Sequence, residues 1–392
     1  MTNLSQINNV SKERISGIEL LKIIAILLII ISHVTQTLST DLTDTVGFND
    51  YFIDLGHSTS NISIFLLVLF RYFGIIGNAI FFVCSAWFLI DSKKTNYQKI
   101  ITIILDTFLI SICWLIPVIA AKGFNYVGTK LLIKSLFPTF FSNNWYITAY
   151  ILFCFISPFL NIIIRNINEK THLLIASALF LCHLLISFFY DFPQTSILFV
   201  WISIYFVISY FKNYHHLICD SAKINVVLLC SGLLGIIVIV SFINFAGLKI
   251  DFLSNKNLYF IRNSNFLTFF IAFGSFNLFK KLRWKSSAIN FVSSVSLFVY
   301  AIHENILFRQ LIRPYFFQWI YNSFGYDYIV VWILLISISL FLLSVVIAIL
   351  FKYTLHHVST FASNKIYTLS GKMANSFSRR VIKDTDEHID EQ

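Results

Sequence analysis

The chain has 392 residues, of which 57% are hydrophobic and only 12% are charged, and its mean hydropathy is +0.77. Ordinary globular domains contain about 25% charged residues, and a soluble fold of this length would leave much of so apolar a surface in water. The composition excludes a soluble globular protein, a disordered chain, a collagen and a coiled coil. It predicts an all-α integral membrane protein.

Apolar segments of about 20 residues, the length that crosses a bilayer as a helix, occur ten times along the chain. They are 17–37, 73–91, 98–121, 145–164, 172–189, 196–211, 224–245, 265–279, 291–311 and 329–351. Two shorter apolar stretches, 59–72 and 129–141, are expected at the membrane interface or as re-entrant segments. The first segment is too long for a signal peptide and lacks a small-residue cleavage site, so we expect it to be retained as a helix.

The basic residues indicate how the chain is oriented, because lysine and arginine gather in cytoplasmic connections. With the N-terminus in the cytoplasm, about two thirds of the 29 basic residues fall on that side. The first outer loop, 38–60, contains no basic residue and carries Asp41, Asp44, Asp50 and Asp54. Ten crossings with both termini in the cytoplasm satisfy this pattern. The net charge of +10 is therefore interpreted as a topology signal and not as a nucleic-acid surface.

Two regions are predicted: a membrane domain over residues 1–352 and a polar cytoplasmic tail over residues 353–392. The tail ends in DTDEHIDEQ and is expected to be flexible and not catalytic. The six cysteines are scattered, mostly in apolar runs, and no CxxC occurs. They indicate neither a disulfide framework nor a metal site.

Polar residues inside the first apolar segment are the most informative feature, because ionisable groups in a membrane are costly and tend to mark function. Lys22 and His33 lie about 20° apart around a helix, and Glu19 lies about 40° from His33. Glu19 and Lys22 can pair at a spacing of three residues. Two alternatives stay open: Glu19 and Lys22 extend to the cytoplasmic interface, or His33 is a hydrogen-bonded core histidine.

The ninth segment carries a second polar cluster, His303, Glu304 and Asn305, about 18 Å along the helix from Phe291. Adjacent His and Glu side chains point in different directions on a helix, so they need not act as a pair. Asp106 lies in the third segment without a partner in its own helix. No histidine spacing resembles a zinc site, so no metal ligands are predicted. His356 and His357 lie near a segment end and are expected to be interfacial or solvated.

These residue types suit a limited chemistry. A neutral histidine is a competent base near neutral pH and can take the proton of an alcohol that attacks an activated acyl group. A positive charge near the cytoplasmic face suits a phosphate-bearing donor, and Lys22, Lys93, Lys94 and Lys99 supply such charge. Positive-inside topology alone also explains the last three.

The chain resembles acyltransferase family 3, whose members include O-acetyltransferases of bacterial surface polysaccharides, from about residue 14 to about residue 350. The stretch IELLKIIAILLIIISH is similar to the family's opening helix, with Glu19, Lys22 and His33 at its acidic, basic and histidine positions, Lys22 replacing the usual arginine. GIIGNAIFFVCSAWFLI is similar to a segment in which Phe81, Phe82 and Ser85 match. NNWYITAYILFCFISPFLN matches at Trp145, Tyr150, Pro158 and Asn161. SVSLFVYAIHEN is similar to the family's Tyr-x-x-His-(Glu/Asp)-Asn box.

The resemblance implies a membrane O-acyltransferase of the bacterial cytoplasmic (inner) membrane. It would move an acyl group from cytoplasmic acyl-CoA, with acetyl-CoA as co-substrate and no permanently bound cofactor, to a hydroxyl of a glycan or glycolipid. On this hypothesis His33 is the general base, and Lys22, held by Glu19, helps place the donor together with Ser85, Lys93, Lys94 and Lys99.

The acceptor side would be formed by Trp145, Tyr150, His303, Glu304 and Asn305. Tryptophan and tyrosine suit sugar faces, but they also suit the interfacial belt of a membrane protein. Both direct transfer and a covalent acyl-histidine route stay open. A non-enzyme is the alternative function: an exporter or flippase-like protein for a polysaccharide intermediate, with the polar face of the first helix lining a path. The absence of a visible internal repeat counts against a transporter.

Overall fold

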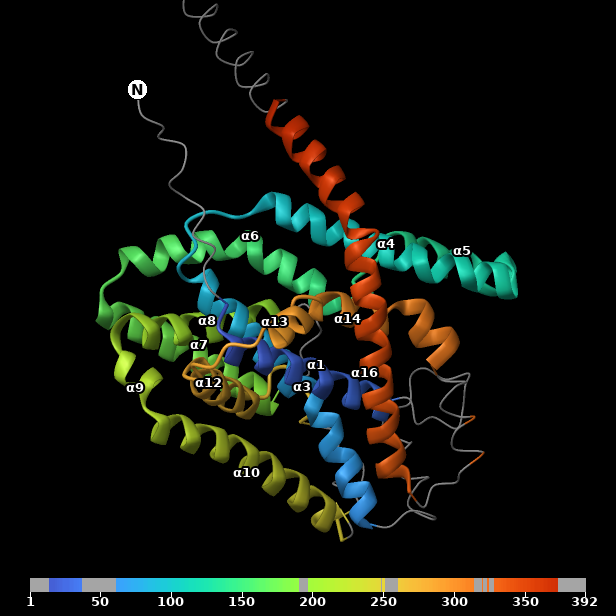
Figure 1. Ribbon diagram of the computed structural model, residues 1–392. Helices are drawn as coiled ribbons and strands as arrows, with labels where there is room; N and C mark the ends of the chain where they lie inside the picture. Colours follow the sequence, from blue (N-terminus) through green and yellow to red (C-terminus); the bar gives the residue numbers. More distant parts are fainter. Residues whose placement is uncertain are drawn as a thin grey trace, which may run out of the picture.

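The computed structural model describes residues 14–36, 61–189, 197–247, 249–250, 260–313, 319, 323 and 328–372, and regular secondary structure in these ranges is helical throughout. Figure 1 shows the helices gathered into a bundle, with α10 along one side and α16 along another. The predicted outer loop over 38–60 and the end of the predicted tail, 373–392, lie outside the described residues. The all-α membrane fold predicted from composition is confirmed.

Eight described helices are long and apolar enough to cross a membrane. They are α1 (Ser16–Gln36), α3 (Asn61–Leu89), α4 (Tyr97–Lys122), α6 (Trp145–Asn166), α7 (Glu169–Phe189), α8 (Ile197–Tyr214), α10 (Ala222–Gly247) and α16 (Ile329–Tyr353). The shorter elements are α5 (Phe124–Leu136), α9 (His216–Asp220), α12 (Phe266–Lys280), α13 (Ser287–Ser293), α14 (Ser296–His303) and the π-helical turn η3 (Phe308–Ile312). The eight long helices, α12 and the α13–α14 pair correspond to the ten predicted segments.

Helix α1 lies inside the bundle, where it packs against α3, α12, α13, α14 and α16. Its close approach to α3 depends on two glycines of α3. A Cβ atom at Gly77 would lie 2.5 Å from the Ala25 carbonyl oxygen, and one at Gly74 would lie 2.6 Å from Ser32 Oγ. Small residues are what allow two helix backbones to approach inside a membrane. This contact fixes α1, the helix that carries the polar face predicted from the sequence.

One of the two short predicted stretches differs from expectation, and the interfacial or re-entrant position of the other stays a prediction. Residues 61–72, predicted to be interfacial or re-entrant, form the first turns of α3, so Arg71 lies in a long helix with 7% of its surface exposed. Residues 124–136 form the separate helix α5, which packs on residues that follow α14 through Val127, Ile306 and Leu307. Hydropathy alone placed the boundary of α3 too late because Arg71 interrupts the apolar run.

The ninth predicted segment is not one continuous helix. Residues 291–311 take in the end of α13, then α14 after a break at Ser294 and Val295, and part of η3, and α14 itself ends at His303. Glu304 adopts a non-helical backbone conformation (φ −104°, ψ 12°) as the residue after α14, and Asn305 Oδ1 accepts a hydrogen bond from the Leu307 backbone N–H. The chain therefore changes direction at Glu304. The side chains of His303 and Glu304 are then not separated by the roughly 100° that neighbouring residues of a helix have.

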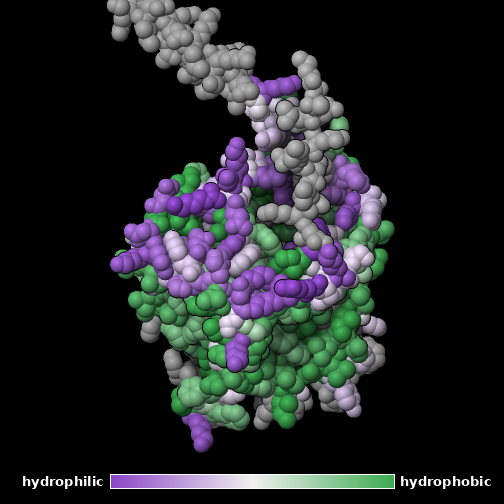
Figure 2. Space-filling view, turned by 60° about the vertical axis from the view of Figure 1, so that its left-hand side comes forward, coloured by the Kyte–Doolittle hydropathy of each residue, from purple (hydrophilic) through white to green (hydrophobic). Residues whose placement is uncertain are grey.

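The first part of the predicted tail is also ordered as a helix. Residues 356–372, called the C-terminal helix below, continue from α16 after a break at Thr354 and Leu355. This helix packs against α4, where the hydroxyl oxygens of Thr102 and Ser363 lie 2.8 Å apart. Figure 2 shows hydrophilic side chains gathered over one end of the molecule, above a broad apolar belt. We call the end at which α1 begins the inner end and the opposite end the outer end.

Candidate functional site

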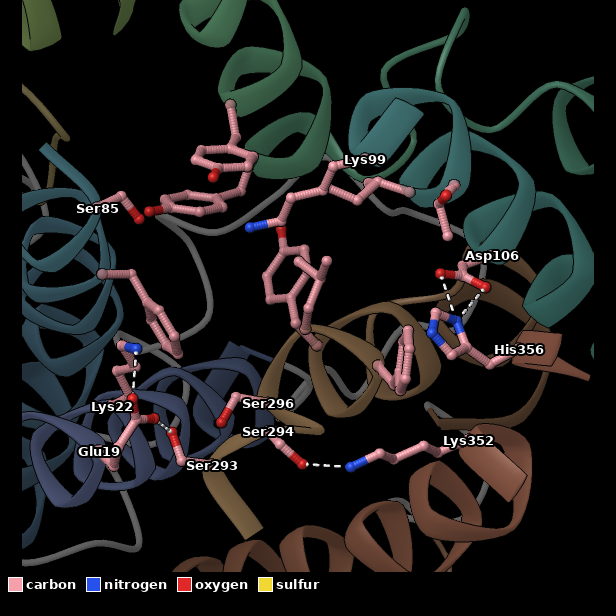
Figure 3. Close-up of a pocket in the computed structure, with 18 of the residues that line it drawn as sticks. Glu19, Lys22, Ser85, Lys99, Asp106, Ser293, Ser294, Ser296, Lys352 and His356 are labelled. Carbon is pink, nitrogen blue, oxygen red and sulfur yellow. Dashed lines mark hydrogen bonds and ion pairs between the residues drawn. The ribbon is translucent and has the colours of Figure 1, made fainter. Parts of the chain in front are cut away.

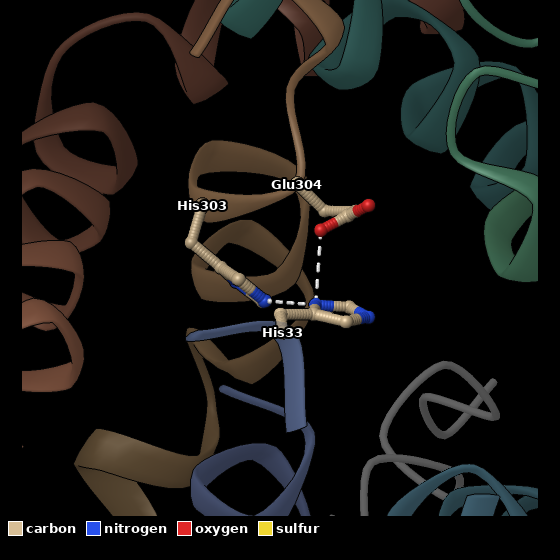
Figure 4. A group of neighbouring side chains, drawn as sticks. All are labelled: His33, His303 and Glu304. Atoms are coloured by element: carbon tan, nitrogen blue, oxygen red, sulfur yellow. Dashed lines mark hydrogen bonds and ion pairs between the residues drawn. The ribbon is translucent and has the colours of Figure 1, made fainter. Parts of the chain in front are cut away.

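Three side chains meet near the end of α1 that is farther from its N-terminus. His33 extends from α1, while His303 and Glu304 come from the end of α14 (Figure 4). His33 Nδ1 lies 2.9 Å from Glu304 Oε2 and 3.1 Å from His303 Nε2. His303 is fully buried, Glu304 is 3% exposed, and the His33 side chain is 12% exposed. We call these three residues the outer cluster.

The hydrogen bonds of the outer cluster define which nitrogen of His33 is protonated. The Val299 carbonyl oxygen lies 2.7 Å from His303 Nδ1, and because a carbonyl only accepts, this nitrogen carries the proton. His303 Nε2 is then an acceptor in the neutral ring. His33 Nδ1 faces two acceptors, His303 Nε2 and a carboxylate oxygen, so it carries a proton as well. Neutral His33 therefore presents Nε2 as its proton-accepting nitrogen, which Figure 4 shows pointing away from the other two residues.

Two arginines hold the Glu304 carboxylate. Arg309 Nη1 lies 2.8 Å from Oε1 and Arg313 Nη1 lies 3.2 Å from Oε2. Both follow the break after α14, so the same change of chain direction places the carboxylate and its cations together. A buried charge needs such partners to remain ionised. A third cation, Arg71, extends from α3 towards α1. Its Nη1 donates a hydrogen bond to the carbonyl oxygen of Ser32, the residue before His33, at 3.2 Å.

The outer cluster also has the residue types of a metal site, since one ligand atom from each residue lies within 4.8 Å of the others. The 3.1 Å separation of the two histidine nitrogens is a hydrogen-bond distance. Both carboxylate oxygens of Glu304 already receive a guanidinium group. These contacts fit a proton-sharing cluster better than they fit a ligand set for a cation. The prediction that the chain has no metal ligands stays a prediction.

A cavity of about 630 Å³ opens at the inner end (Figure 3). We call it the inner cavity; its volume is in the range of small-molecule sites. It is lined by residues of α1, α3, α4, α6, α13, α14, α16 and the C-terminal helix. The polar and charged side chains on its wall are Arg14, Glu19, Lys22, Ser85, Asn96, Gln98, Lys99, Thr102, Asp106, Tyr146, Tyr150, Ser293, Ser294, Ser296, Tyr300, Lys352 and His356.

The inner cavity approaches the outer cluster closely. Its wall runs along α1 from Glu19 to Ile29, about 15 Å of helix, and Ile29 is one turn from His33. Tyr300 lines the same cavity, and its ring lies 5.7 Å from the ring of His303 in an edge-to-face contact. The cavity and the outer cluster are therefore neighbours along α1, although His33, His303 and Glu304 do not line the cavity themselves.

The carboxylates of the inner cavity are already paired. Glu19 accepts from Lys22 Nζ at 3.2 Å and from the Ser293 hydroxyl, as the spacing of Glu19 and Lys22 predicts. Asp106, for which the sequence offers no partner, has both carboxylate oxygens 3.0 Å from His356 Nδ1. His356 comes from the C-terminal helix. The sequence predicted it to be interfacial or solvated; in the structure its side chain is 30% exposed and is paired with Asp106.

The structure separates the residues predicted to bind the donor. Ser85 and Lys99 lie on the wall of the inner cavity together with Lys22 and Glu19. Lys93 and Lys94 are exposed in the turn between α3 and α4 and do not line it.

The residues predicted to bind the acceptor are separated as well. Tyr150 lines the inner cavity with the predicted donor residues, whereas Trp145 does not line it and packs edge-on against Tyr146. His303 and Glu304 meet His33, while the Asn305 side chain caps the backbone of the following turn.

Sequence reasoning missed the cations that surround these groups. Arg71, Arg309, Arg313 and Lys352 enter the sequence analysis only through the count of basic residues on each side of the membrane. A charge count assigns a residue to one side of the membrane and carries no information about contacts between helices. The spacing of Arg309 and Arg313, four residues apart and just after Glu304, is the one local signal that indicated a partner for this carboxylate.

Taken together, the fold and the site define a multi-pass membrane protein in which a charged cavity lies next to a largely enclosed histidine that is paired with a carboxylate. The comparison with protein families agrees with this description. A family model for an acyltransferase domain, that of acyltransferase family 3, matches residues 15–354, and the chain belongs to this family. Neither the search of curated proteins nor the search of solved structures found a match.

Proposed function

We propose that this membrane acyltransferase moves an acyl group, with acetyl as the expected one, from cytoplasmic acyl-CoA to a hydroxyl of a cell-surface or lipid-linked glycan. The bacterial cytoplasmic membrane is its expected location. The observation that carries the proposal is the inner cavity, whose wall carries Arg14, Lys22, Lys99 and Lys352 and reaches Ile29, one helical turn from His33. A donor with a charged head and a long acyl-bearing arm fits such a cavity.

In this proposal His33 acts through Nε2, because Glu304 and His303 hold the proton on Nδ1. Nε2 takes the proton of the acceptor hydroxyl while the oxygen attacks the thioester carbonyl. The carbon–sulfur bond then breaks, and the thiolate leaves with the proton that His33 returns. Glu304 stabilises the imidazolium that forms between the two steps, and its two arginines keep it ionised.

The test is the O-acyl content of the host's surface polysaccharide, measured by NMR in a deletion strain that carries a plasmid copy. Wild type and a control with an exposed histidine changed, His216→Ala, are expected to restore the acyl signal. His33→Ala is expected to lose it, since a general base contributes roughly 10²–10⁴-fold to the rate. Polysaccharide yield should be equal in the three strains.

Two outcomes would contradict this function. Full acylation by His33→Ala at equal protein level would show that this histidine is not the base. Loss of the surface polysaccharide on deletion, with no change in its acylation, would show an exporter instead of an enzyme.

A further inference from the structure

Three basic side chains on the wall of the inner cavity have no carboxylate partner among the described residues: Arg14, Lys99 and Lys352. The two carboxylates on the same wall, Glu19 and Asp106, are paired with Lys22 and His356. The inner cavity therefore keeps positive charge that the protein does not neutralise. Focused charge of one sign in a cleft raises the local concentration of oppositely charged ligands.

Of the three, Lys99 and Lys352 are the best placed to bind an anionic ligand in the cavity. Lys99 stands in the first turn of α4, and Figure 3 shows its amino group reaching into the cavity. Within the described chain its Nζ makes no hydrogen bond or ion pair. Lys352, in the last turn of α16, donates to the Ser294 hydroxyl at 2.7 Å and lies 5.2 Å from the centre of the Phe291 ring. A neutral hydroxyl leaves the ammonium charge of Lys352 uncompensated.

The C-terminal helix joins the two lysines' helices through a row of polar contacts with α4, which we call the polar seam. Gln98, Thr102 and Asp106, spaced by four residues along one face of α4, meet Asn364, Ser363 and His356. All three of these α4 residues and His356 line the cavity. The seam thus fixes the end of α16, and with it Lys352, relative to Lys99. The C-terminal helix lies beyond residue 354, the last residue that the family model matches.

We propose that Lys99 and Lys352, which reach into the inner cavity from two of its sides (Figure 3), provide a phosphate subsite for the phosphate groups of the acyl donor, and that the polar seam positions the two lysines. The inference rests on the proposed function and names the part of the donor that each end of the cavity binds. Lysine ammonium groups donate several charge-assisted hydrogen bonds to a phosphate, and these are stronger than neutral ones. The deeper, aromatic part of the cavity, with Tyr146, Tyr150 and Tyr300, then receives the uncharged arm.

A phosphate at this position has two sources, the nucleotide of CoA or the headgroup of an anionic lipid. The experiment separates them with protein in nanodiscs of neutral phosphatidylcholine, to which phosphatidylglycerol is added in a second series. Binding is measured for CoA and for CoA that lacks its 3′-phosphate (dephospho-CoA). The variants are Lys99→Gln and Lys352→Gln, with Lys372→Gln, on the exposed part of the C-terminal helix away from the cavity, as control.

We expect wild type and Lys372→Gln to bind CoA about tenfold more tightly than dephospho-CoA, the ratio that one charged hydrogen bond provides. Lys99→Gln and Lys352→Gln should each weaken CoA binding by about tenfold and reduce the difference between the two ligands. His356→Ala, which opens the polar seam without removing a lysine, should reduce the same difference by a smaller factor.

Two results would overturn the proposal. The first is an unchanged ratio of CoA to dephospho-CoA affinity in both lysine variants. The second is a lysine effect that appears only when phosphatidylglycerol is present, since the subsite would then hold a lipid headgroup. Acyl transfer is measured separately with the same preparations. Transfer without the ratio effect overturns only the subsite, whereas the ratio effect without transfer overturns the proposed function.

Discussion

The outer cluster and the inner cavity place ionisable groups in opposite ways. In the outer cluster, His303 and Glu304 are almost fully buried and the carboxylate is bound by two arginines of the same chain segment. In the inner cavity, Lys99 is exposed and Lys352 half-buried, without acidic partners in the part of the chain described. Fixed partners suit the outer cluster if its residues must keep one arrangement of protons. Unpaired ammonium groups suit the inner cavity if it must bind an anionic ligand. The difference supports the proposed function, in which the outer cluster carries out the chemistry and the inner cavity binds the donor.

The strongest test of this division changes the carboxylate of the outer cluster. Glu304→Gln keeps the shape but removes the charge that stabilises protonated His33, so we expect kcat to fall about 10²-fold. The KM for acyl-CoA should change less than about twofold, because the inner cavity is untouched. Steady-state kinetics on purified protein in nanodiscs measures both constants.

The matched control is Glu169→Gln, which changes an exposed glutamate at the start of α7. A Glu304→Gln enzyme that loses affinity for acyl-CoA as strongly as it loses kcat would show that the two regions are not separate. A thermal unfolding curve for each variant distinguishes this result from partial unfolding.

The shared support of both regions is the contact of α1 with α3. Gly77→Leu would force a side chain against the Ala25 carbonyl oxygen, between Lys22 and His33, and overpacking of this kind costs about 1–3 kcal/mol. We expect a lower unfolding temperature and a loss of both acyl-CoA binding and turnover. Gly371→Leu, in the C-terminal helix where an added Cβ meets nothing within 4 Å, is the control. Normal stability of Gly77→Leu would show that the two helices can move apart at little cost.

The smallest expected effect concerns the polar seam. Asp106→Asn weakens the contact with His356, which we expect to raise the KM for acyl-CoA about threefold while kcat stays the same, in line with the loss of roughly one hydrogen bond. His356→Ala should have a similar effect, and the double variant should add little, because the two residues act through one contact. A change in kcat instead would place Asp106 in the chemistry.

The sequence was sufficient for the features that depend on one helix. Helical periodicity placed Glu19, Lys22 and His33 on one face of α1, and residue hydropathy located the ten apolar segments. It was insufficient where contacts join distant segments. The pairing of Asp106 with His356 spans 250 residues, and no local pattern encodes it.

The broken ninth segment shows the same limit in another form. Its residues are apolar enough for one helix, and the serines at its break are compatible with a helix or a turn. Beyond the end of α14 at His303, Glu304 contacts Arg309 and Arg313 a few residues further along the chain and His33 of the distant helix α1. Periodicity therefore predicted that His303 and Glu304 point apart, whereas both reach the same imidazole ring.

Because α1 carries both Lys22 and His33, one continuous helix sets the spacing between the inner cavity and the outer cluster. The two residues are eleven positions apart, close to three full turns, so they share a face. Inserting one residue between them would rotate His33 by about 100° and raise it by about 1.5 Å relative to Lys22. In the proposed function, the number of residues between Lys22 and His33 therefore sets how far the acyl arm of the donor must extend from the inner cavity to reach the base.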